Sequence, residues 1–396
     1  MTGVARWRML VLLALAELCG MSLWFVGSAV AVPLAHRWGL DAAQVGWLTG
    51  SVQLGFVAGT AVAAVLNVAD LIPARRYFAV SAALAAGANS TLLVVPSYEA
   101  ALVARFATGA LLAGVYPPAM KMIATWFTAD RGLAIGVIVG ALTVGKAAPY
   151  LLSALEGAGP DAVVLGASAA ALVAAALVAV GYRDGPAPFP RRAFSWSLVS
   201  DIVRHRETRL ATSAYLGHMW ELYAMWTWLP AFLVASAAAR AELGKPSPSA
   251  SGVAALSFAV IAAGGAGCVW GGWSARRLGS ARVAAWALRV SGVCALGIGM
   301  LFGASFWLLV PVALVWGFFV VADSAQFSAL VTQLAPPHAV GTALTLQTSL
   351  GFLLTLATIQ GVPVVVEAIG WRWAFAALAL GPVAGLAALR ALDSQP

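Results

Sequence analysis

Long apolar stretches separated by short polar ones repeat along the whole chain. A bilayer core about 30 Å thick takes roughly 20 helical residues to cross. About twelve runs approach that length, near residues 9–31, 43–66, 77–95, 98–123, 133–155, 162–182, 211–235, 250–272, 283–303, 306–330, 341–366 and 372–391. In lipid a helix satisfies its own backbone hydrogen bonds, and the sequence lacks the short alternating strands of a barrel. The pattern therefore predicts an all-α integral membrane protein with about 12 transmembrane helices.

The composition agrees with this prediction and sets the orientation. Of the 396 residues, 62% are hydrophobic and 10% are charged, against roughly 45–50% and about 25% in soluble domains. Many of the arginines behind the net charge of +8 gather in alternate loops. Such an excess indicates membrane topology and contact with anionic lipid rather than a nucleic-acid site. The positive-inside rule predicts that both termini are cytoplasmic, and we expect a multi-pass protein of the cell (inner) membrane.

The longest polar stretch lies between the sixth and seventh runs and is rich in Pro and Arg. It predicts a cytoplasmic linker over 183–210, between an N-terminal six-helix bundle over 1–182 and a C-terminal six-helix bundle over 211–396. Residues from about 195 to 209 are expected either as an amphipathic helix on the inner leaflet or as a solvated tether.

The first and seventh runs share a motif. The motif Glu-Leu-x-x-Met-x-x-Trp occurs twice, 204 positions apart. Its residues are Glu17, Leu18, Met21 and Trp24 in the first run and Glu221, Leu222, Met225 and Trp228 in the seventh. The motif lies in the first run of each predicted six-helix half, which indicates that the two halves arose by duplication. Helical spacing predicts that Glu17, Met21 and Trp24 share one face, as do His218, Glu221, Met225 and Trp228.

Several short motifs resemble those of the major facilitator superfamily of secondary transporters. The stretch LNVADLIPARRYF keeps Asp70, Arg75 and Arg76 of a loop signature but not its glycines, and LVARFATGALLAG carries Arg105 and Gly109 of a span-four signature. WFTADRGLAIG and GWRWAF are also frequent in the family. The resemblance covers essentially the whole chain and implies two six-helix bundles that alternate access to a central site.

Two departures from family patterns bear on the substrate. Lys146 interrupts the glycine-proline signature that marks many drug/proton antiporters in span five. The chain also looks loosely like the cyanate and nitrate porters, but it lacks the arginines that nitrate porters carry in spans two and eight. The resemblance therefore favours a small anion other than nitrate over a standard drug exporter.

Ionisable residues within the runs are the candidates for proton coupling, because a charge near the bilayer centre is costly unless it is paired or faces water. Glu17 and Glu221 fall close to the expected midplane, and His218 adds a group that titrates near neutral pH. We predict that Glu221 and His218 together form the protonation site, with Glu17 as a partner or an ion-pair anchor. The alternative is that both glutamates are structural.

Basic and aromatic residues supply the predicted substrate contacts. Lys146 lies near the middle of the fifth run and needs an anionic partner, either a glutamate or a substrate carboxylate or oxyanion. Tyr150 follows one turn later, and Arg105 is expected either at the substrate or in the packing of span one. The predicted cavity-lining aromatic residues are Trp24, Trp228 and Tyr116.

Five further residues are predicted to gate the transporter at its cytoplasmic side. The family motif implies that Asp70, Arg75 and Arg76 form an inner gate and orientation lock. Asp323 and Lys121 fall near the cytoplasmic ends of their runs, where Asp323 is expected at an inner gate, and Lys121 either snorkels outward or pairs with an acid.

These observations predict a proton-coupled secondary active transporter that moves a small organic or inorganic anion by rocker-switch alternating access. Efflux of amphipathic or cationic compounds is the alternative within transport, and a membrane sensor or enzyme on a transporter-like scaffold is the alternative of another class. No catalytic or metal motif is visible, so we expect no enzyme activity, cofactor or metal. The expected partners are the solute, protons and the lipid bilayer, and we expect a monomer.

Overall fold

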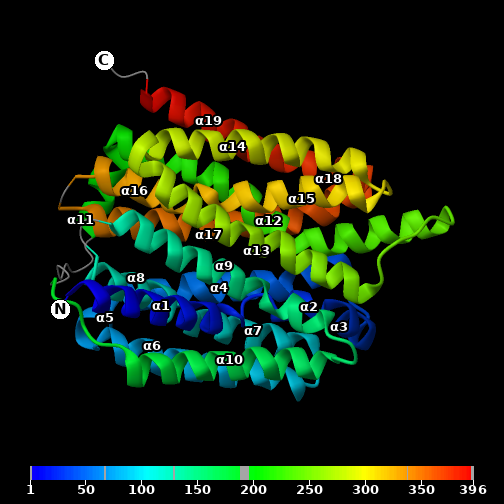
Figure 1. Ribbon diagram of the computed structural model, residues 1–396, viewed down its shortest axis with the longest axis horizontal. Coiled ribbons are helices and arrows are strands. Elements are labelled where there is room, and N and C mark those ends of the chain that lie inside the picture. The colour runs from blue at the N-terminus through cyan, green and yellow to red at the C-terminus, as the bar shows by residue number, and fades with distance from the viewer. Residues whose placement is uncertain (1, 67, 128–129, 188–195, 337, 394–396) are drawn as a thin grey trace. The chain divides into compact units, whose positions relative to one another are not determined.

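The computed structural model describes residues 2–66, 68–127, 130–187, 196–336 and 338–393 (Figure 1). Within these ranges the secondary structure is helical and contains no strand. The contacts divide the chain into two compact units, unit 1 over Met1–Phe194 and unit 2 over Ser195–Pro396.

The helices of unit 1 are at most twenty residues long, apart from three that exceed twenty residues. They are α1 (Thr2–Met21), α2 (Val26–Ala29), α3 (Ala31–Trp38), α4 (Ala42–Val65), α5 (Val68–Leu71), α6 (Ala74–Ser90), η1 (Thr91–Leu93), α7 (Tyr98–Leu112), α8 (Tyr116–Ala124), α9 (Arg131–Ala154) and α10 (Pro160–Gly181).

Unit 2 contains longer uninterrupted helices. They are α11 (Trp196–Arg204), α12 (Arg206–Glu242), α13 (Ala250–Leu278), α14 (Ser280–Gly297), η2 (Ile298–Leu301), α15 (Phe306–Ala322), α16 (Ser324–Leu334), α17 (Val340–Ile369), α18 (Trp371–Ala374), η3 (Phe375–Ala379) and α19 (Leu380–Asp393). In Figure 1, α13, α14 and α15 run side by side, in agreement with their mutual contacts.

Ten helical segments in the described part of the chain are long and apolar enough to cross a membrane. They are Ala42–Val65, Tyr98–Ala124, Arg131–Ala154, Pro160–Gly181, Arg206–Glu242, Ala250–Leu278, Ser280–Leu301, Phe306–Leu334, Val340–Ile369 and Trp371–Asp393. The predicted runs 9–31 and 77–95 are not among them. The first is interrupted after Met21, and the second is covered by α6, a helix of 17 residues, followed by η1. The full count of twelve crossings and the orientation of the termini stay predictions.

The two units repeat the same order of helix pairing. In unit 1, α1 packs on α9 and α10, α6 packs on α10, and α4 packs on α7. In unit 2, α12 packs on α17 and α19, α14 packs on α19, and α13 packs on α15. This is the arrangement expected if both units descend from one ancestral bundle.

Glycines let α4 and α7 approach each other closely in unit 1. A Cβ atom on Gly109 would lie 1.9 Å from the carbonyl oxygen of Val52, and one on Gly59 would lie 2.3 Å from that of Ala110. No side chain fits at such distances, so the backbones of the two helices are in direct contact. The Gly109 of the predicted span-four signature is thus a packing residue.

The same two contacts recur in unit 2, between α13 and α15. A Cβ on Gly317 would lie 1.9 Å from the Val260 carbonyl oxygen, and one on Gly267 would lie 2.1 Å from that of Phe318. Each of these four residues follows its counterpart in unit 1 by 208 positions. The repeat therefore extends from the sequence motif to the backbone contacts that hold the helices together.

The predicted linker is partly helical. Residues 188–195 lie outside the described residues, and α11 follows them, with Ile202 buried and Val203 half exposed. α11 contacts α12 and α17 of its own unit. α12 starts at Arg206 rather than near 211, so part of the predicted linker belongs to the first long helix of unit 2. The role of 183–210 as a cytoplasmic linker stays a prediction.

Candidate functional site

The first helix breaks within the repeated motif. α1 ends at Met21, the turn Ser22–Phe25 follows, and α2 begins at Val26. The prediction that Trp24 continues the helical face of Glu17 is therefore wrong, because Trp24 lies in the turn. In unit 2 the equivalent Trp228 stays within the unbroken α12 and donates from Nε1 to the carbonyl oxygen of Ile359 at 2.8 Å.

Arg105 holds this break in place. Its guanidinium is fully buried and donates to the backbone oxygens of Leu23 at 2.9 Å and Trp24 at 2.5 Å. It also donates to Oδ1 of Asn89 at 2.8 Å and to the backbone oxygen of Leu48 at 3.5 Å. A broken helix leaves carbonyl groups without their usual partners, and Arg105 supplies the donors. These contacts favour the packing role for Arg105 over substrate contact.

Two buried ionisable residues, Glu17 and Lys146, lie near each other inside unit 1. Glu17 is fully buried, and neither of its carboxylate oxygens has a hydrogen-bond partner among the described residues. Lys146 on α9 is also buried and lies within electrostatic range of Glu17. Its Nζ sits 4.1 Å from the centroid of the Trp24 ring, a cation–π contact. The residue before it, Gly145, brings α9 against α1, since a Cβ there would lie 2.2 Å from the Leu18 carbonyl oxygen.

The other residues predicted around Lys146 differ in their surroundings. Tyr150 is buried one turn further along α9, with its ring 6.4 Å from that of Phe25. Tyr116 begins α8 and Lys121 lies near its end, and both are half-buried. Of these three residues, Tyr150 is the one on the same helix as Lys146.

The predicted gate residues of unit 1 follow α4. Arg75 and Arg76 are exposed in the first turn of α6. Asp70 belongs to α5, and its side chain lies outside the described part of the structure. Their gating role stays a prediction.

Glu221 in unit 2 is held by two neutral donors. Its Oε1 accepts from Nε1 of Trp316 at 2.6 Å, and its Oε2 accepts from Oγ of Ser291 at 2.8 Å. All three side chains are buried. Trp316 and Ser291 come from α15 and α14, and no spacing in the sequence links them to Glu221. The prediction identified the carboxylate but missed both of its partners.

His218 contacts Asp323 rather than Glu221. Nδ1 of His218 on α12 lies 2.8 Å from Oδ1 of Asp323, and both side chains are about 1% exposed. The prediction that His218 shares its site with Glu221 needs correction, because Glu221 is one turn further along α12 and is engaged by Trp316 and Ser291. Asp323 is buried where α15 gives way to α16.

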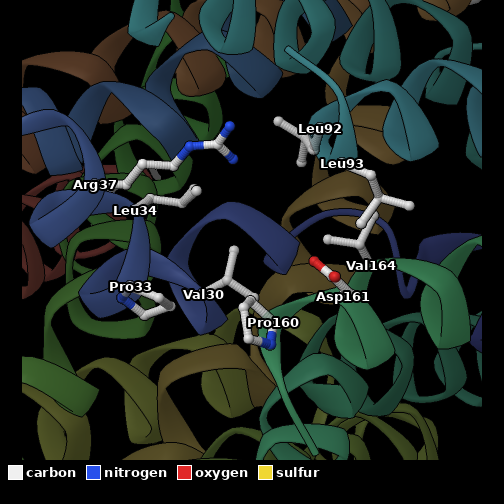
Figure 2. Close-up of a pocket in the computed structure, with 9 residues that line it drawn as sticks. All are labelled: Val30, Pro33, Leu34, Arg37, Leu92, Leu93, Pro160, Asp161 and Val164. Atoms are coloured by element: carbon white, nitrogen blue, oxygen red, sulfur yellow. The ribbon is translucent and has the colours of Figure 1, made fainter. Parts of the chain in front are cut away.

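A pocket opens elsewhere in unit 1, around α3, η1 and the start of α10. Figure 2 shows its nine lining residues, which are Val30, Pro33, Leu34, Arg37, Leu92, Leu93, Pro160, Asp161 and Val164. None of these residues is among the predicted functional residues, so the pocket does not coincide with the Glu17–Lys146 pair.

The fold and its intramembrane charges are those of a multi-pass membrane transporter, and a comparison with protein families gives the same class. The family model of the Major Facilitator Superfamily matches residues 12–359. The chain belongs to the Major Facilitator Superfamily and is a transporter rather than an enzyme. No curated protein sequence matches the chain.

Solved structures share the fold over nearly the full length. A bacterial homologue of the human lysosomal transporter Spinster, inward-facing and unoccupied, is 15% identical with a TM-score of 0.71, and the match covers 99% of this chain and 96% of that one. A mutant of the nucleoside transporter NupG is 16% identical with a TM-score of 0.72, covering 98% and 99%. At these identities the likeness concerns the fold.

Proposed function

We propose that the protein is a proton-coupled secondary transporter of a small anion, and that Glu17 and Lys146 are its coupled binding site. One observation carries the proposal. A buried lysine on the face of Trp24 lies within electrostatic range of a fully buried glutamate that has no hydrogen-bond donor among the described residues.

Competition between Glu17 and the anion provides the coupling. A buried ammonium needs a negative partner, because an unpaired charge in the membrane costs several kcal/mol. When Glu17 is ionised it fills that role, and when Glu17 takes up a proton the positive charge of Lys146 becomes available to an anion. Proton binding and anion binding then favour each other, and thermodynamic linkage requires this effect to be reciprocal. Such a site supports movement of a proton and an anion together.

The remaining features of the proposal carry over the predictions made from the sequence. Access to the site alternates by a rocker-switch movement, with Asp70, Arg75, Arg76 and Lys121 acting at the cytoplasmic gate. The protein works as a monomer in the inner membrane with both termini in the cytoplasm. Arg105 acts on the solute only indirectly, since its donors bind Asn89 and the backbone.

A binding screen with purified protein tests the anion site. Melting temperatures are measured with sodium salts of small carboxylates and inorganic oxyanions, because an anion at about 100 times its Kd stabilises the folded state by about 2.7 kcal/mol. We expect stabilisation by at least one anion, its loss in Lys146→Met, and its retention in Lys245→Met, which removes an exposed lysine. If Lys146→Met fails to fold, the double variant Glu17→Gln/Lys146→Met is used in its place and should also lose the stabilisation by the anion.

Two outcomes would overturn the proposal. One is an anion that stabilises Lys146→Met as strongly as the unmodified protein. The other is a protein that organic cations stabilise and anions do not, with the stabilisation by cations lost in Glu17→Gln. That result would favour efflux of cationic compounds. Proteoliposomes under an imposed pH gradient then establish whether the bound anion is moved and in which direction.

A further inference from the structure

The junction between α15 and α16 in unit 2 contains an aspartate that does not cap its helix. Asp323 precedes α16, and its backbone oxygen accepts from the amides of Gln326 at 2.8 Å and Phe327 at 3.2 Å. Aspartate at such a position usually accepts a first-turn N–H with its side chain, and its backbone is then extended. Here φ is −88° and ψ is −13°, and the side chain makes no capping bond. The carboxylate turns instead to His218.

The His218–Asp323 pair is enclosed by aromatic rings. The His218 ring lies 5.9 Å from that of Tyr215 and 5.5 Å from that of Phe327. Nε2 of His218 is buried and has no hydrogen-bond partner among the described residues. The titratable groups recorded near the pair are Tyr215 and Glu221, both on α12, and Glu221 in turn lies near Cys294 on α14. From α16, Phe327 contributes no charge.

Unit 1 has the same junction without the polar pair. Val115, 208 positions before Asp323, precedes α8 at the break that follows α7. Ala14, 204 positions before His218, occupies the equivalent place on α1. Both units therefore interrupt this helix at the same point, and the interruption does not require the histidine and aspartate. The pair is an addition to unit 2 that packing alone does not explain.

We propose that His218 and Asp323 form a proton-binding latch that sets the angle between α15 and α16. With a proton on each ring nitrogen, His218 is positive and holds the Asp323 carboxylate against α12. When the Nε2 proton leaves, the buried carboxylate loses the charge that offsets it, and leaving it uncompensated is costly. The carboxylate then turns to the N–H groups in the first turn of α16, as an N-cap does. This requires Asp323 to adopt an extended backbone, which re-angles α16.

The latch goes beyond the proposed anion site, because it lies in unit 2 and does not depend on the identity of the solute. It also assigns different roles to the two acids of unit 2. Asp323 exchanges partners when His218 loses its proton. Glu221 has a structural role, because its hydrogen bonds to Trp316 and Ser291 join α12 to α15 and α14.

Spin-label distances within unit 2 test the latch. Labels are attached to cysteines placed at Leu278, exposed at the end of α13, and at Thr332, exposed on α16, in a background without Cys19, Cys268 and Cys294. In the full-length protein in nanodiscs, we expect the distance distribution to shift between about pH 5 and pH 8. The double variant His218→Ala/Asp323→Val, which copies the residues of unit 1, should lose the shift.

Glu221→Gln is the matched control and should keep the pH-dependent shift. A shift that persists in His218→Ala/Asp323→Val would overturn the proposal, as would the absence of any shift in the unmodified protein. His218→Gln replaces the double variant if the latter does not elute as a folded species. None of these results depends on anion binding, so the latch and the Glu17–Lys146 site can fail separately.

Discussion

Glu17 in unit 1 and Glu221 in unit 2 occupy the same place in a repeated motif but have opposite surroundings. Both oxygens of Glu221 accept hydrogen bonds, from Trp316 and Ser291. Neither oxygen of Glu17 has one among the described residues, and its nearby charge is Lys146. The two neutral donors fix the carboxylate of Glu221, whereas Glu17, with a lysine nearby and no hydrogen bond in the described part of the chain, can exchange partners. Duplicated acids thus acquire different roles through residues on other helices.

The partner positions explain how the two sites diverged. The residue 208 positions before Trp316 is Thr108, whose hydroxyl donates to the carbonyl oxygen of its own helix at Ala104, 2.8 Å away. Conversely, the residue 208 positions after Arg105 is Ala313. Unit 1 therefore has the arginine that holds a helix break and lacks the indole donor, while unit 2 has the indole donor and an unbroken α12.

The largest expected effect comes from Arg105→Lys. This substitution removes the guanidinium that donates to the backbone oxygens in the turn after α1, a contact that distinguishes unit 1 from unit 2. A lysine cannot reproduce the planar fork, and each buried carbonyl left without a donor costs about 1–3 kcal/mol. We expect destabilisation of about 3 kcal/mol or more, measured as the free energy of unfolding in detergent micelles. Arg289→Lys, at an exposed position in unit 2, should change stability by less than about 0.5 kcal/mol. Equal effects would remove Arg105 from its structural role.

The next effect tests what the two units share. Gly109→Ala and Gly317→Ala each place a Cβ 1.9 Å from a backbone oxygen of the neighbouring helix. Overpacking costs about 1–3 kcal/mol, and we expect values near the upper end, of similar size in both units. Gly87→Ala on α6 and Gly361→Ala on α17 meet nothing within 4 Å and should be neutral or slightly stabilising. A large difference between Gly109→Ala and Gly317→Ala would argue against equivalent packing.

A smaller effect separates the two glutamates. Trp316→Phe removes one donor from Glu221 while keeping an aromatic ring, and should cost about 1–2 kcal/mol. Glu17→Gln alone would leave the buried Lys146 without its negative partner, so the matched variant is Glu17→Gln/Lys146→Met. It removes both charges and no hydrogen bond to Glu17 recorded among the described residues, and should be close to neutral or stabilising. The same unfolding measurement serves both variants. If Glu17→Gln/Lys146→Met proved the more damaging of the two variants, Glu17 would be the structural acid.

Apolar periodicity predicted most of the fold because a bilayer imposes its thickness on every helix that crosses it. It did not predict the turn at Ser22–Phe25, since that break depends on Arg105, which is more than eighty residues away in the chain. Composition also identified the buried acids, because each is an unusual residue in an apolar run.

The partners of those acids were harder to predict. His218 was expected beside Glu221, three positions away on the same helix, yet it contacts Asp323 from the α15–α16 junction. Trp316 and Ser291 carry no charge and are not unusual in a membrane helix, so nothing in the sequence distinguishes them from packing residues. The sequence singled out Lys146 as a candidate substrate contact because a lysine in an apolar run needs an anionic partner.

Proton uptake on anion binding tests the central claim, that Glu17 and Lys146 form one coupled site. Titration calorimetry with a stabilising anion, in buffers that differ in ionisation enthalpy, counts the protons taken up per anion bound. We expect uptake approaching one proton, equivalent to about tenfold tighter binding for each unit decrease in pH, and none in Glu17→Gln, which should bind the anion independently of pH. Unchanged proton uptake in Glu17→Gln would contradict the account.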